Sequence, residues 1–108
     1  MSGSKDQRAA ERFPVNSASS CDFVSPVLED FGPVRIKNLS CEGVGLICSH
    51  RLDVGLLLVV NLVNPAQKVS KTLLTRVIHC TGLIGGNFLI GGSFLTPLTY
   101  EELRAFVL

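Results

Sequence analysis

Two short clusters near the start of the chain carry polar groups that could hold a ligand. Arg8 and Arg12 stand four positions apart in the segment QRAAERFPV. Asn38, Ser40 and Gly43 follow in NLSCEGVGLICS, in the pattern Asn-x-Ser-x-x-Gly. Guanidinium groups supply charged donors, and the amide and hydroxyl supply further donors and acceptors. These are the groups that an anionic ligand needs.

Spacing lets each cluster act as a unit. Arg8 and Arg12 lie on one side of the chain whether it is helical or extended, because a helical turn has 3.6 residues and strand faces repeat every two. On an extended strand, Asn38 and Ser40 project from the same face. Gly43 would permit a tight turn into the next strand and leave room for a ligand ring.

Each cluster also has a structural interpretation. The two arginines could be solvated charges on a tail that also contains Asp6 and Glu11. Asn38 and Ser40 could be turn residues that bond local backbone. Either pattern alone is weak, whereas both together in this order favour a site.

Composition limits the classes of function. The 108 residues suit one domain, with 46% hydrophobic and 18% charged residues. A net charge of +1 excludes the broad basic surface of a duplex-binding protein, so we expect no DNA partner. The low charge and few aromatic residues also disfavour a barrel that binds single-stranded nucleic acid.

Further features argue against export, membrane insertion and catalysis. The polar N-terminus has no apolar signal region, and the most apolar run, Val54–Val63, is about half of the ~20 residues of a bilayer crossing. We therefore expect a cytoplasmic protein, in which the four cysteines, without CxxC spacing, are small buried hydrophobes. His50 and His79 match no common zinc set and no Ser-His-Asp set, so we expect no metal, no cofactor and no enzyme activity.

The pattern of apolar residues predicts a mainly β protein. Residues 1–11 lack large apolar side chains and are expected to be a flexible segment, followed by one domain over 12–108. Six extended segments are expected within 12–26, 32–40, 43–49, 55–63, 68–82 and 88–95, several with period-two alternation. Short connections between them predict an antiparallel six-stranded barrel.

The C-terminus has a different pattern. Thr99 followed by Glu102 forms a capping box, and Leu98 and Leu103 fall where a hydrophobic staple would lie. A short amphipathic helix is predicted over about 99–107, packed on the barrel.

With these features in place, the sequence resembles the PilZ domain family, bacterial receptors for the second messenger cyclic di-GMP. Arg8 and Arg12 match the family's RxxxR, and Asn38, Ser40 and Gly43 match its (D/N)xSxxG. The segment IGGSF at 90–94 resembles a late strand of the family. The resemblance covers nearly the whole chain. It implies a six-stranded barrel, a nucleotide on its outer surface and an arginine segment that folds over the ligand.

The chemistry of the ligand agrees with these residue types. Guanine presents two adjacent acceptors that a guanidinium fork can satisfy, and the same group pairs with phosphate oxygens. The resemblance therefore predicts a non-enzymatic cyclic di-GMP receptor whose ordered N-terminal segment signals to a downstream protein partner. The alternative is an adaptor of the same fold that binds another protein without nucleotide, since the segment around Arg8 and Arg12 is less basic than is usual in the family.

Overall fold

The computed structural model describes residues 11–25 and 33–107. Its strands are β2 (Ser20–Ser25), β3 (Arg35–Leu39), β4 (Gly43–Cys48), β5 (Leu57–Asn64), β6 (Val69–Gly82) and β7 (Phe88–Phe94), and they are followed by helix α2 (Tyr100–Val107). A short 3₁₀ turn, η1 (Pro65–Gln67), joins β5 to β6. The expected mainly β chain with a short C-terminal helix is confirmed.

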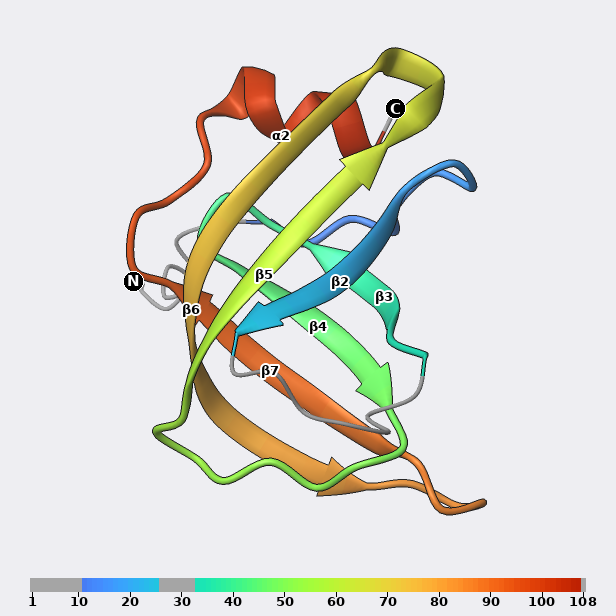
Figure 1. Ribbon diagram of the computed structural model, residues 1–108, viewed down its shortest axis with the longest axis vertical. Helices are drawn as coiled ribbons and strands as arrows, with labels where there is room; N and C mark the ends of the chain where they lie inside the picture. Colours follow the sequence, from blue (N-terminus) through green and yellow to red (C-terminus); the bar gives the residue numbers. More distant parts are fainter. Residues whose placement is uncertain (1–10, 26–32, 108) are drawn as a thin grey trace, which may run out of the picture.

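The six strands form one antiparallel sheet in the order β2-β5-β6-β7-β4-β3. The sheet is strongly curled, so that β2 lies across from β3 and β4 (Figure 1). Because β2 and β3 are its two edges, the described strands form a half-barrel. The closed barrel expected from the sequence is not seen among them.

Alternating side chains give the curled sheet an apolar inner face. On β4, Val44, Leu46 and Cys48 are buried, and equivalent positions on β5, β6 and β7 complete the core. Residues between them face outward, as period-two alternation requires. The outward face of β4 carries two residues without side chains, Gly43 and Gly45.

Helix α2 closes the end of the curled sheet at which β5 turns into β6 (Figure 1). Leu103 and Phe106 bury its apolar side in the core, and Leu98, just before the helix, is buried as well. The side chain of Asn64, at the end of β5, donates from Nδ2 to the carbonyl oxygen of Ala105 at 2.7 Å. Among the described residues, no helix is long and apolar enough to cross a membrane.

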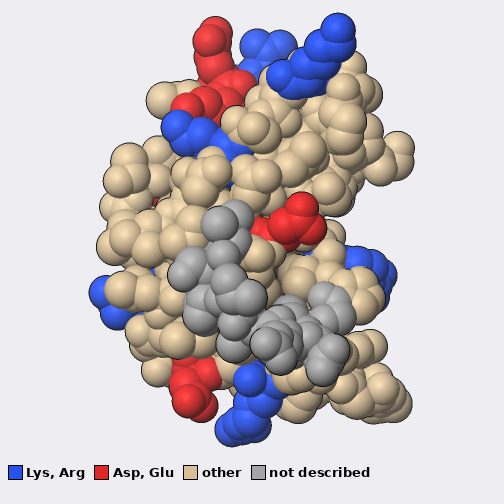
Figure 2. Space-filling model, viewed as in Figure 1, with Lys and Arg blue, Asp and Glu red and all other residues tan. Residues whose placement is uncertain are grey.

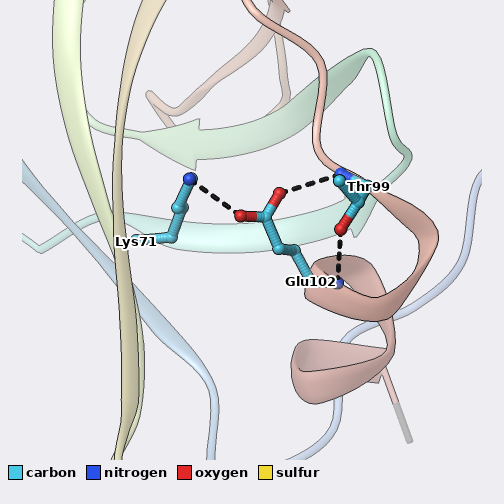
Figure 3. A network of polar contacts seen from close by, with 3 residues as sticks. All are labelled: Lys71, Thr99 and Glu102. Carbon is cyan, nitrogen blue, oxygen red and sulfur yellow. Dashed lines mark hydrogen bonds and ion pairs between the residues drawn. The ribbon is translucent and has the colours of Figure 1, made fainter.

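The predicted capping box starts α2. The amide of Glu102 donates to Thr99 Oγ1 at 3.1 Å, and the amide of Thr99 donates to Glu102 Oε1 at 2.8 Å. The other carboxylate oxygen of Glu102 pairs with Lys71 Nζ of β6 at 2.8 Å (Figure 3). The bond to Lys71, and then that to Thr99, lowers the pKa of the Glu102 carboxyl. The capping residue Glu102 thus also connects α2 to strand β6 through its ion pair with Lys71.

Candidate ligand-binding site

The two sequence clusters meet on the outer surface of β3. Arg12 Nη1 donates to Asn38 Oδ1 at 2.9 Å. The backbone behind Arg12 is fixed to the same strand, because Phe13 and Leu39 exchange two hydrogen bonds of 2.8 Å each. The backbone pairing of Phe13 with Leu39 therefore holds Arg12 close to β3. Arg8 lies outside the described residues, as does almost all of the segment 1–11 predicted to be flexible.

A small hollow of about 140 Å³ lies beside this contact. The residues that line it come from the segment before β2 and from four strands: Arg12, Lys37, Asn38, Gly45, His79, Leu89 and Gly91. Drug-sized ligands usually occupy pockets of about 300–1,000 Å³. The hollow is therefore large enough for one part of a dinucleotide, with the remainder lying over the adjoining surface.

The floor of the hollow is glycine backbone. Asn38 pairs with Gly45, Gly45 pairs with Gly91, and Gly91 pairs with His79 in successive ladders. These four residues form a row across β3, β4, β7 and β6. A Cβ at Gly45 would lie 2.7 Å from Asn38 Oδ1, and one at Gly91 would overlap the His79 ring. The two polar side chains thus lean over a floor that has no side chains of its own.

Ser40 occupies a different place from the one its spacing suggested. Strand β3 ends at Leu39, and the Ser40 side chain is only 2% exposed. Its hydroxyl oxygen accepts from the amides of Glu42 at 3.2 Å and Gly43 at 3.0 Å. Ser40 therefore has the turn-forming role considered above as its structural alternative, and it does not line the hollow. A direct contact with a ligand stays a prediction.

Gly43 begins β4 and also lies outside the lining of the hollow. Its amide donates to Ser40, and a Cβ at this position would overlap the carbonyl oxygen of Gly92 on β7. The residue thus permits the close approach of two strands next to the turn. The glycine that borders the hollow is Gly45, two residues later, and the space above it is occupied by the Asn38 side chain.

The charged groups at the hollow are cationic. Arg12 and Lys37 line it, and among the described residues no acidic side chain does. On the face drawn in Figure 2, basic and acidic side chains are both scattered over the surface, without a broad basic patch. Two cations at a small hollow suit a small anionic ligand, whereas a nucleic-acid polymer requires a broad basic surface.

Five lining residues were not selected from the sequence as ligand contacts: Lys37, Gly45, His79, Leu89 and Gly91. The glycines had a visible signal. Gly45 stands two positions after Gly43, hence on the same strand face, and the Gly91-Gly92 pair indicated a close backbone approach. His79 had no such signal, because its neighbours across the sheet depend on strand register.

The cysteines and histidines show no sign of a metal centre in the described ranges, where no group of three or more potential ligands gathers. Cys21 and Cys48 are buried, and Cys41 and Cys80 are half-buried. Burial raises the pKa of the Cys21 thiol to about 12, with a smaller effect of Asp22. Burial also raises the pKa of Cys48. These two thiols have the packing role expected of them.

Comparison of the chain with protein-family models, with curated protein sequences and with solved structures found no match.

Proposed function

We propose that this protein is a cyclic di-GMP receptor with a PilZ-type barrel fold. The observation that supports the proposal best is the 2.9 Å bond from Arg12 to Asn38. It joins residues 26 positions apart, one from each of the two motifs, at the edge of a hollow on the outer face. A shared site requires the two motifs to meet, and Arg12 and Asn38 do so.

The geometry suits the ligand chemically. Arg12 uses one N–H group on Asn38, so that its remaining donors are available to a guanine edge or a phosphate. Lys37 adds a second charge at the same hollow. The glycines leave room for the Asn38 and His79 side chains to lie over the sheet, where their polar groups can face a bound base. Ser40, in this proposal, acts by holding the turn that follows Asn38.

Arg8 completes the proposed site. It lies four residues before Arg12, so its Cα is at most about 14 Å from that of Arg12 along an extended chain. A ligand seated on the glycine floor is within this reach. Binding would then fix residues 8–12 over the nucleotide and present a new surface to a downstream protein. Arg12, already bonded to Asn38, would be the fixed point of that rearrangement.

Calorimetric titration with cyclic di-GMP tests the proposal. We expect saturable binding, and we expect Arg12→Ala to weaken it by about 1.5–3 kcal/mol, the value of a charge-assisted hydrogen bond. Arg104→Ala is the matched control, because it removes the same charge from an exposed position on α2. GMP and cyclic di-AMP as competing ligands test whether the site needs guanine and two phosphates. Absence of binding by the wild-type protein would refute the proposal.

A nucleotide-independent adaptor is the second candidate, and exposed apolar side chains favour it. Leu57 and Leu74 project from neighbouring strands β5 and β6, and Leu83 and Ile84 form the exposed tip of the β6–β7 hairpin. Neighbouring exposed apolar groups can mark a protein interaction site. If the protein is such an adaptor, an NMR titration with cyclic di-GMP should leave the amide signals of Arg12, Asn38 and Gly45 unchanged.

A further inference from the structure

The position of His79 depends on an irregularity in β6. Val77 faces the core, Ile78 is exposed, and simple alternation would then turn His79 inward. The pairing of β6 with β7 shifts between Val77 and His79, which is the mark of a β-bulge. Bulges redirect the side chains that follow them. As a result His79 is exposed on the outer face, where it lies over Gly91.

His79 and Asn38 form opposite walls of the hollow. They stand at the two ends of the row Asn38–Gly45–Gly91–His79 and are separated only by glycines. Any side chain at Gly91 would overlap the imidazole ring. The bare backbone at this position therefore lets the ring lie across the floor. A ligand that fills the hollow must touch it.

We propose that His79 contacts the ligand directly and makes its binding dependent on pH. This inference rests on the proposed function and adds to it a contact and a form of regulation. A neutral imidazole offers one donor and one acceptor, whereas the imidazolium offers two donors and a positive charge. The protonated ring suits a phosphate, or the two adjacent acceptors of a guanine edge.

The charged surroundings of His79 give the direction of the effect. Arg12 and Lys37 share the hollow with it, Arg76 precedes it on β6, and Arg35 lies on the outward face of β3. The half-buried thiol of Cys80 follows in the chain. Strands β4 and β7 contribute glycines and Leu89 to the hollow, hence no charge. An anionic ligand would be the first negative group to line the hollow among the described residues.

Ligand binding is therefore coupled to proton uptake. An anion against the ring favours the imidazolium, so the complex keeps this proton at higher pH than the free protein does. The additional affinity is expected at acid pH, where the ring is protonated, and it is lost as pH rises. One charge-assisted bond corresponds to about a tenfold change in the dissociation constant.

Calorimetry with cyclic di-GMP at about pH 5.5 and about pH 8 tests this, using the wild-type protein, H79Q and H50Q. His50 is the only other histidine and does not line the hollow, so H50Q is the matched control. We expect the wild type and H50Q to bind about tenfold more tightly at the lower pH. H79Q should show no such gain. If H79Q keeps the affinity and pH dependence of the wild type, the inference is wrong.

NMR of the ring protons provides a second readout on the unmodified protein. With H50Q used for assignment, the His79 ring signals should shift on addition of cyclic di-GMP, and their titration midpoint should move to higher pH. The His50 signals should not respond. Binding without any response of His79 would overturn this inference and leave the proposed function intact. A wild-type protein that does not bind would refute both.

Discussion

A methyl group at Gly45 would lie 2.7 Å from Oδ1 of Asn38, its partner across the β3–β4 pair. The neighbour that must move is the end of a side chain, and no backbone atom is involved. Gly45→Ala should therefore change stability by less than about 1 kcal/mol while it displaces Asn38 and narrows the hollow. We expect cyclic di-GMP affinity to fall about tenfold or more in calorimetry.

Gly43→Ala provides the contrast on the same strand. The added methyl would overlap the carbonyl oxygen of Gly92, which cannot move without a shift of β7. We expect a loss of about 1–3 kcal/mol in the free energy of unfolding, measured with urea. Comparison of the two variants distinguishes a glycine that borders the hollow from a glycine that allows two strands to approach closely. Equal effects on stability from the two variants would contradict this assignment.

The sequence was sufficient to predict five of the strands and the C-terminal helix, but within the first expected segment, 12–26, the strand covers only Ser20–Ser25. Alternating residues such as Val34 and Ile36 against Arg35 and Lys37 indicate a strand, and the Thr99–Glu102 capping box indicates a helix start. Both signals are local, since they arise within a few residues of chain. Short connections account for the pairs β3–β4, β5–β6 and β6–β7, whereas β2–β5 and β4–β7 join strands that are not consecutive in the chain. Whether its edges meet depends on twist, which no local pattern specifies.

The candidate site was only partly predictable, because its residues meet through register. The motifs pointed to Arg12 and Asn38, which the structure brings together. They did not point to His79, because the bulge after Val77 leaves no mark in the segment RVIHC. The position of Ser40 also differs from the one that its spacing predicts. Its spacing from Asn38 places it on the outward strand face, but the chain turns after Leu39 and buries it.

Ser40→Ala tests how that residue acts. The hydroxyl is buried and accepts from two amides, so its removal leaves both donors without this partner. We expect a loss of about 1–3 kcal/mol in the free energy of unfolding. At a temperature where the variant is fully folded, cyclic di-GMP affinity should fall by less than in Asn38→Ala. Ser93→Ala, on the outward face of β7, is the control for loss of a serine hydroxyl.

A direct ligand contact by Ser40 would give the opposite ranking. In that case the folded Ser40→Ala variant would lose at least as much affinity as Asn38→Ala. Thermal unfolding monitored by circular dichroism establishes the temperature at which both variants are folded. The comparison distinguishes a positioning role, acting through the turn, from a binding role.

The contact of Glu102 with Lys71 predicts how α2 responds to acid. Because the folded state lowers the pKa of this carboxyl, the contact stabilises the fold above the unfolded-state pKa, near the ordinary value of 4.5. The stabilisation disappears as pH falls through the lowered value, where the carboxylate takes up a proton. Glu102→Gln keeps an acceptor for the Thr99 amide and removes only the charge. It should lower the melting temperature slightly at pH 7, as for other exposed ion pairs.

Melting curves of the wild type and Glu102→Gln over about pH 2–7 check this, and the two should converge at the acid end. Glu101→Gln is the matched control, because it removes a carboxylate from the same helical turn and leaves the Lys71 bond in place. Thr99→Ala should cost about 1 kcal/mol at any pH, since its hydroxyl does not titrate. A constant difference between the wild type and Glu102→Gln across the whole range would show that the ion pair with Lys71 does not stabilise the helix.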